Sequence, residues 1–154
     1  MGNSATTEAL RFSSSDGAVV GVPRRWLRLE GLTLLLGSLV AYSTTRQAWW
    51  LVPVTLLSPD LLMVGYLAGT RSGGSMYNLA HTTSLPAALI GLGWWQHQRL
   101  ALALGLVWLA HIGMDRLMGY GLKYGDNAQH THLGLLGSHK APAEPHLSSV
   151  TISP

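Results

Sequence analysis

A histidine and an aspartate stand four residues apart near the end of a long apolar run, residues 100–117. At this spacing the two side chains, His111 and Asp115, project from the same side of a helix. A charged group at the centre of a membrane helix costs roughly 2.5–3.5 kcal/mol on insertion scales, so it needs a partner, water or a function. The pair is therefore the first candidate for a chemical site.

Two more ionisable residues, Asp60 and His81, lie in separate apolar stretches. Imidazole and carboxylate groups are zinc-type ligands, and a catalytic zinc has three protein ligands and a water molecule. His81, His111 and Asp115 supply three ligands, and Asp60 or His132 supplies a fourth ligand or a base. Such a divalent metal lowers the pKa of its bound water and supports hydrolysis, with Asp60 and Asp115 as the catalytic carboxylates.

Two other interpretations of this polar pocket remain open. In the first, the pocket is a structural network that joins Arg116 to Glu30 or to an aspartate, with Asn78 on the same helix face as His81. Buried polar contacts of this kind hold membrane bundles together at about 0.6 kcal/mol each. In the second, the carboxylates and histidines relay a proton or a small ion through the membrane.

The composition places these residues in a membrane protein. The chain has 154 residues, of which 47% are hydrophobic and 11% are charged, whereas soluble domains carry about 25% charged residues. The net charge of +3 is modest and no dense basic patch is present, so nucleic-acid binding is excluded. The absence of cysteine excludes disulfides, iron–sulfur clusters and thiol catalysis.

Four apolar segments are long enough to cross a bilayer as helices, which takes about 20 residues each. They cover residues 27–44, 48–68, 77–96 and 99–119. Because the connections are short, neighbouring helices are antiparallel, and the sequence predicts an all-α fold, a four-helix transmembrane bundle. A polar tail at 1–23 precedes the membrane domain at 24–137, which ends in a glycine- and histidine-rich loop. Residues 138–154 are typical of a tail that is disordered or ordered by a partner.

Lysine and arginine accumulate on the cytoplasmic side of membrane proteins. Most of them fall on one side of the predicted bundle, and only Arg46 and Arg99 fall on the other. Both chain termini are therefore expected in the cytoplasm. At a rise of about 1.5 Å per residue, Glu30 and the four candidate site residues all lie in the cytoplasmic half of the membrane. The sequence thus predicts a polar pocket that opens towards the cytoplasm.

Five ordered motifs resemble a known family. They are the runs SPDLLMVGY (58–66), YNLAHT (77–82), AHIGMDR (110–116), GYGLKY (119–124) and THLG (131–134), with LEG (29–31) near the start. Together they are similar to an uncharacterised bacterial membrane family, domain-of-unknown-function family 4260, over residues 27–136. The resemblance implies a small integral membrane protein and brings no activity, substrate or cofactor with it.

A looser resemblance is to membrane-bound metal-dependent hydrolases. These carry a Pro-Asp pair, a helix start of the His-x-x-Thr/Ser type and a later His–Asp helix. The matching positions here are Asp60, His81, His111 and Asp115. The order of the motifs agrees, although the hydrolase pattern contains more histidine. This resemblance favours the metal interpretation.

The leading hypothesis is a multi-pass protein of the bacterial cytoplasmic (inner) membrane with a cytoplasm-facing polar or metal-binding pocket. In this hypothesis it is a metal-dependent hydrolase that acts on a lipid-like or amphipathic substrate in the bilayer. The alternative is a non-enzymatic accessory subunit of a larger membrane complex, with its tails held by other membrane protein chains. The first hypothesis requires the four candidate side chains to converge within about 5 Å of one another, around a point that is open to water.

Overall fold

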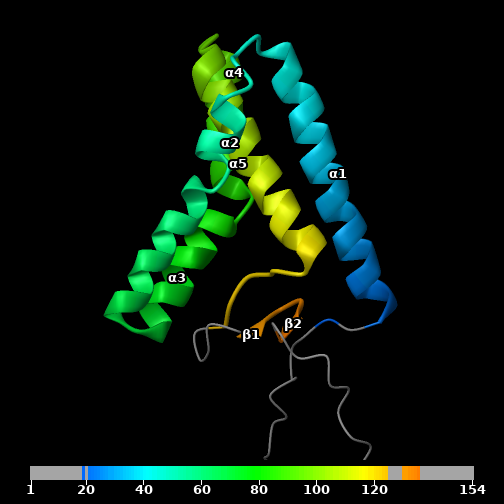
Figure 1. The fold of residues 1–154 in the computed structure, drawn as a ribbon, viewed down its shortest axis with the longest axis vertical. Helices are drawn as coiled ribbons and strands as arrows, with labels where there is room; N and C mark the ends of the chain where they lie inside the picture. Colours follow the sequence, from blue (N-terminus) through cyan, green and yellow to red (C-terminus); the bar gives the residue numbers. More distant parts are fainter. Residues whose placement is uncertain (1–18, 20, 125–129, 136–154) are drawn as a thin grey trace, which may run out of the picture.

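The computed structural model describes residue 19 and residues 21–124 and 130–135 of the chain. This part is helical except for a short hairpin, so the predicted all-α class is confirmed for it (Figure 1). The helices are α1 (Val22–Thr44), α2 (Leu51–Thr55), the 3-10 helix η2 (Ser58–Ala68), α3 (Thr70–His81), α4 (Ser84–Trp95) and α5 (Arg99–Met118). Two antiparallel strands follow, β1 (His130–Thr131) and β2 (Gly134–Leu135).

Helices α1 and α5 are in backbone contact at a pair of glycines. A Cβ atom added to Gly113 would lie 2.5 Å from the backbone nitrogen of Leu35 and 2.7 Å from the carbonyl oxygen of Gly31. Such close packing is typical of small residues at helix interfaces in membranes. Gly113 faces away from His111 and Asp115, because two residues turn a helix by more than half a circle. Helix α1 therefore supports the back of the site-bearing helix.

The second and third predicted helices are interrupted. The segment predicted at 48–68 consists of α2 and η2, and the segment predicted at 77–96 is divided between α3 and α4. A continuous helix at 77–96 was therefore a wrong prediction, because Thr82 is extended, with φ −77° and ψ 138°. Pro59 and Pro86 lie in the first turns of η2 and α4. Proline lacks an N–H and its ring clashes with the carbonyl four residues before it, so both sites favour a new helix start.

The chain nevertheless runs four times between the two ends of the molecule (Figure 1). Helix α1 and the α3–α4 pair run in one direction, and α2 with η2 and then α5 run in the other. Two of these passes, Leu51–Ala68 and Arg99–Met118, are long and apolar enough to cross a membrane. Only 11% of the first apolar window is buried, against 50% of the second. Helix α5 is accordingly the more central element, with α1 and α4 packed against it.

The hairpin packs against the chain that leaves α5. The Leu122 amide donates to Nδ1 of His132 at 2.8 Å, and the His132 amide donates to the Leu122 carbonyl at 3.0 Å. Asn78 of α3 holds the neighbouring residue: its side chain donates to the Lys123 carbonyl at 2.8 Å and accepts from the Lys123 amide at 2.7 Å. The segment after α5 is therefore fixed between α3 and the hairpin.

Candidate metal centre

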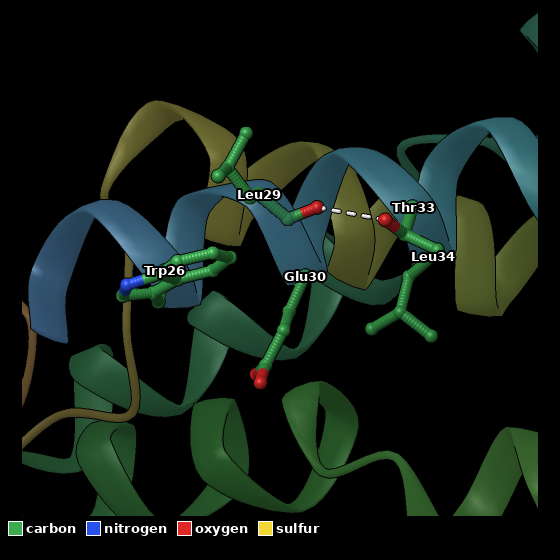
Figure 2. A pocket seen from close by; sticks show the side chains of 5 residues that line it. All are labelled: Trp26, Leu29, Glu30, Thr33 and Leu34. Atoms are coloured by element: carbon green, nitrogen blue, oxygen red, sulfur yellow. Dashed lines mark hydrogen bonds between the residues drawn. The ribbon is translucent and has the colours of Figure 1, made fainter.

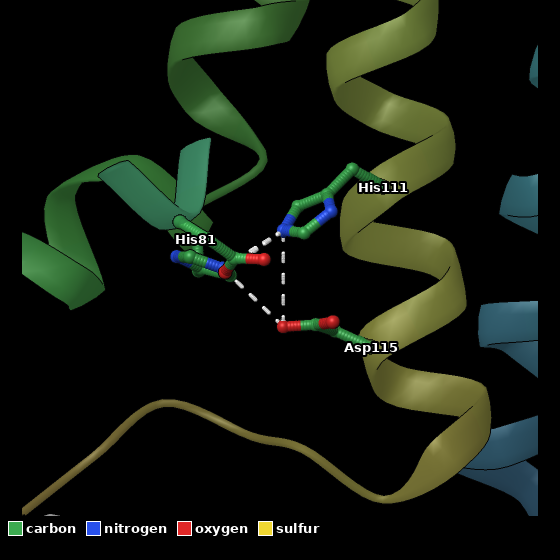
Figure 3. A group of neighbouring side chains, drawn as sticks. His81, His111 and Asp115 are labelled. Atoms are coloured by element: carbon green, nitrogen blue, oxygen red, sulfur yellow. Dashed lines mark hydrogen bonds and ion pairs between the residues drawn. The ribbon is translucent and has the colours of Figure 1, made fainter. Parts of the chain in front are cut away.

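Four ionisable side chains converge where the helices are interrupted. One ligand atom from each of Asp60, His81, His111 and Asp115 lies within 4.8 Å of those of the other three. Nε2 of His81 is 3.0 Å from Nε2 of His111, 3.4 Å from Oδ1 of Asp60 and 3.3 Å from Oδ2 of Asp115. Nε2 of His111 is 3.5 Å from the same Asp60 oxygen and 3.9 Å from the same Asp115 oxygen. Figure 3 shows three of these side chains pointing towards one another from α3 and α5.

Three of these five separations match those around a tetrahedral metal ion, and the other two, 3.0 Å and 3.9 Å, lie on either side of them. Four ligands at about 2.0–2.2 Å from a central zinc are separated from one another by roughly 3.3–3.6 Å. The distances from His81 to the two carboxylates, and from His111 to Asp60, fall in or next to this range. The donor set also suits the ion, because neutral imidazole and carboxylate are the usual nitrogen and oxygen ligands of zinc. The cluster is therefore a group that can hold a divalent metal.

Each side chain owes its place to the element that carries it. His111 and Asp115 are four residues apart on α5, so both face α3. His81 is the last residue of α3, and Asp60 is in the first turn of η2, so both lie beside a helix interruption. The two interruptions therefore bring ligands from separate passes to one place.

A second layer of contacts orients the ligands. The Nδ1 atom of His81 lies 2.8 Å from the carbonyl oxygen of Tyr77. A carbonyl only accepts, so Nδ1 carries the proton and Nε2 presents its lone pair to the cluster. The Tyr77 hydroxyl donates to Oδ2 of Asp115 at 2.9 Å, and the Tyr77 ring stacks on the His81 ring with centroids 3.7 Å apart. Trp108 of α5 donates its indole N–H to the carbonyl of Ala80 at 2.7 Å, which ties α5 to the end of α3.

The centre is enclosed on one side and open on another. His111 is fully buried and His81 is 4% exposed, whereas the Asp60 side chain is 38% exposed. A cavity of about 160 Å³ is lined by Ser58, Pro59, Leu62, Ala80 and Trp108, several of which adjoin cluster residues in the chain. A much smaller void of about 10 Å³ is lined by residues that include His81 and Asp115. Access from outside is thus on the Asp60 side.

Other residues proposed from the sequence lie around the cluster or apart from it. His132 is in the turn of the hairpin, outside the four-residue cluster, and burial lowers the pKa of its imidazole. Asn78 holds the segment after α5 and is not a ligand. Arg116 lines the small void and forms no ion pair with any acidic residue in the described part of the chain. The expected pairing of Arg116 with Glu30 or an aspartate is thus not made there.

Glu30 lies apart from the cluster, on the exposed side of α1. It lines a cavity of about 400 Å³ together with other residues of the same helix, Trp26, Leu29, Thr33 and Leu34 (Figure 2). Glu30 therefore lies near the start of α1, but its side chain lines a separate surface cavity and takes no part in the cluster.

Two residues beside the cluster were not singled out from the sequence as site residues, namely Tyr77 and Lys123. Lys123 is 7% exposed, and its Nζ lies 4.0 Å from the ring centroid of Tyr77 and 5.0 Å from that of Tyr66. Burial lowers the pKa of the Lys123 ammonium below its ordinary value, and the charges of Asp115 and Asp60 act against this shift. The motif GYGLKY contains Lys123, but only the folded hairpin places it at the site.

Comparison with known proteins gives a family and no activity. No curated protein and no solved structure matches the chain, so the looser resemblance to metal-dependent hydrolases finds no support there. A family model described as a domain of unknown function (DUF4260) matches residues 24–136, which include all four residues of the cluster. This match spans most of the 154 residues, and the chain therefore belongs to the DUF4260 family.

Proposed function

We propose that the protein is a membrane-embedded, metal-dependent hydrolase with a divalent, zinc-type ion held by His81, His111 and Asp115. Asp60 is the fourth ligand or the general base. The observation that carries this proposal is the convergence of four ligand atoms within 4.8 Å of one another, with three of their separations matching those of a tetrahedral ion. Helix packing alone does not require two carboxylates and two imidazoles within 4.8 Å of one another.

The residues of the centre have distinct tasks in this proposal. A bound divalent metal supplies Lewis acidity and lowers the pKa of a coordinated water. Asp60, the most exposed of the four, accepts the proton of the attacking water. Asp115 is held in one orientation by the Tyr77 hydroxyl. His81 keeps its Nε2 lone pair directed at the centre because its Nδ1 is bound to the Tyr77 carbonyl.

The surface supports a location in the lipid bilayer. Large apolar side chains are exposed along the passes, among them Leu61 at 73%, Leu67 at 89% and Trp94 at 75%. An exposed apolar surface of this extent is typical of contact with lipid or with another protein. The two apolar passes Leu51–Ala68 and Arg99–Met118 are consistent with it. We place the protein in the cytoplasmic membrane as a four-span bundle, with a lipid-like or amphipathic substrate reaching the Asp60 side of the centre.

The first test is the metal content of the detergent-purified protein, measured by mass spectrometry after expression with added zinc. The wild type is expected to hold about one zinc per chain. His81→Ala and His111→Ala are expected to lose nearly all of it. His97→Ala is the matched control, because His97 is an exposed loop residue outside the cluster and should leave the zinc in place.

The second part of the test is activity. The zinc-loaded protein is expected to release p-nitrophenol from at least one p-nitrophenyl carboxylate or phosphate ester. Asp60→Asn is expected to keep most of the zinc, since three ligands remain, and to lower the rate by about 10²–10⁴-fold, as loss of a general base does. A folded wild type without metal would contradict the proposal and favour the non-enzymatic subunit. If the wild type and Asp60→Asn both bind zinc and hydrolyse the ester at equal rates, the role of Asp60 as the general base is contradicted.

A further inference from the structure

Two arginine side chains of α1 meet at the end of α5, beside Gly119. A Cβ atom built on Gly119 would lie 2.7 Å from Nη2 of Arg28 and 3.5 Å from Nη2 of Arg24. Arg24 and Arg28 are four residues apart, so they project from the same side of α1. The two guanidinium groups therefore reach one place at the junction of α1 and α5.

No acidic side chain of the described residues neutralises these two cations. Every ion pair in the described part of the chain joins a histidine to Asp60 or Asp115. Glu30, the one acidic residue of α1, follows Arg28 by two residues and so stands about 200° further round the helix. The Nε atoms of Arg24 and Arg28 are buried and have no hydrogen-bond partner in the described residues. Like charges at one place repel each other, so the pair lacks an anion.

The helix ends at this junction offset only part of the positive charge. The last carbonyls of α5 are partially negative, and Arg28 donates to that of Met118 at 3.4 Å. A helix C-terminus is equivalent to about half a negative charge, which is too little for two guanidinium groups. The first turn of α1 acts in the opposite sense, because its end is partially positive and has no acidic residue and no side-chain cap. A bound anion would therefore stabilise both the arginine pair and the start of α1.

An exposed apolar stripe runs along α1 away from this junction. Leu29, Leu36 and Val40 are 50%, 53% and 69% exposed, and their spacings of seven and four residues place them on one side of the helix. Arg25 is exposed one turn before Leu29, so a third cation stands at the start of the stripe. This order of positive charge followed by apolar surface matches a phospholipid, in which a phosphate group continues into acyl chains.

We infer that the junction of α1 and α5 binds the headgroup of an acidic phospholipid, with Arg24 and Arg28 on its phosphate and the acyl chains along the stripe. Guanidinium groups bind phosphate oxygens through paired, charge-assisted hydrogen bonds. Basic pockets between membrane helices on the cytoplasmic side bind anionic headgroups in this way. An acidic lipid is favoured over a zwitterionic one, because its headgroup brings no ammonium group towards the arginines. The inference uses the membrane location of the proposed function and is independent of the metal centre.

The test measures lipid binding to the detergent-purified protein by native mass spectrometry. The separate probes are dioleoyl phosphatidylglycerol, dioleoyl phosphatidylcholine and inorganic phosphate. The wild type is expected to prefer phosphatidylglycerol to phosphatidylcholine and to keep it in the presence of inorganic phosphate. Arg24→Gln should weaken phosphatidylglycerol binding by about 5-fold and the double variant Arg24→Gln/Arg28→Gln by about 30-fold, the loss expected for one and two basic side chains at an anionic lipid. The control Arg46→Gln/Arg99→Gln removes the same charge from exposed positions at the other end of the molecule and should bind like the wild type.

Arg24→Gln decides the result even if the loss of Arg28 disturbs the fold, because no hydrogen bond joins Arg24 to another described residue. Equal phosphatidylglycerol affinity in the wild type and both variants overturns the inference, and so does equal affinity for the two lipids. Displacement of the lipid by inorganic phosphate assigns the junction to a soluble anion and overturns the lipid as its ligand. Zinc content measured on the same samples separates the failures, because intact zinc binding without a preference for the acidic lipid leaves the proposed metal centre standing.

Discussion

At the scale of single residues, Tyr77 links the ligands of α3 and α5. Its carbonyl oxygen accepts the Nδ1 hydrogen bond of His81, and its hydroxyl donates to Asp115 at 2.9 Å. Tyr77→Phe removes the hydroxyl and keeps the ring that stacks on His81. We expect zinc affinity to fall by about 10- to 100-fold, as it does when an outer partner of a ligand is lost. Competition with a zinc-binding dye in detergent measures the change.

Tyr66→Phe is the control for this substitution. The Tyr66 hydroxyl is buried and has no hydrogen-bond partner in the described part of the chain, so its removal should leave zinc affinity unchanged. Equal affinities for wild type and Tyr77→Phe would show that Asp115 needs no orientation from Tyr77.

Local spacing accounts for what the sequence predicted at this scale. His111 and Asp115 were predicted as neighbours because four residues separate them on one helix, and Asp60 and His81 because they were expected at the same depth. Lys123 was not predicted as a site residue, because its position depends on contacts with Asn78 and with the hairpin that are distant in sequence. Patterns within one helix are visible in a single sequence, and contacts between separate segments are not.

At the scale of helices, the packing of α1 on α5 depends on Gly113. An added Cβ would lie 2.5 Å from the Leu35 backbone nitrogen, and backbone cannot move aside as a side chain can. We expect Gly113→Ala to destabilise the protein by about 1–3 kcal/mol, the usual range for overpacking. Unfolding in mixed micelles with increasing sodium dodecyl sulfate measures this.

The matched control lies on α1. A Cβ at Gly37 meets no atom within 4 Å, so Gly37→Ala should be neutral or stabilising by up to about 1 kcal/mol through helix propensity. If Gly113→Ala proves as stable as Gly37→Ala, the backbone contact between α1 and α5 does not hold the two helices together.

The helix interruptions were only partly predictable. Pro59 and Pro86 were visible in the sequence and mark the starts of η2 and α4. The long apolar run around them nevertheless suggested continuous spans, because apolar residues on both sides of a break look like one segment. The extended conformation of Thr82 places His81 at a helix end, and Trp108 of α5 holds this end through its hydrogen bond to the Ala80 carbonyl, a contact that the sequence does not show.

At the scale of the whole molecule, the four passes place the loops at two opposite ends (Figure 1). The described lysine and arginine residues gather at the end where α1 begins and α5 ends: Arg24, Arg25, Arg28, Arg71, Arg116 and Lys123. Arg46 and Arg99 lie at the other end. The excess of positive charge favours the first end as cytoplasmic. This argument supports the proposed orientation, with the metal centre nearer the cytoplasmic side.

The chain contains no cysteine, so single introduced cysteines report the topology without background. Ala48→Cys and Gln98→Cys lie at one end, and Val22→Cys and Thr70→Cys at the other, all at exposed positions. In intact spheroplasts, a membrane-impermeant maleimide is expected to label the first two and to reach the second two only after lysis, because the bilayer then separates the ends. The opposite labelling would invert the orientation and put the metal centre near the outer face. Equal labelling of all four before lysis would mean that the passes do not span a sealed membrane, and the exposed apolar side chains would then require a protein partner to cover them.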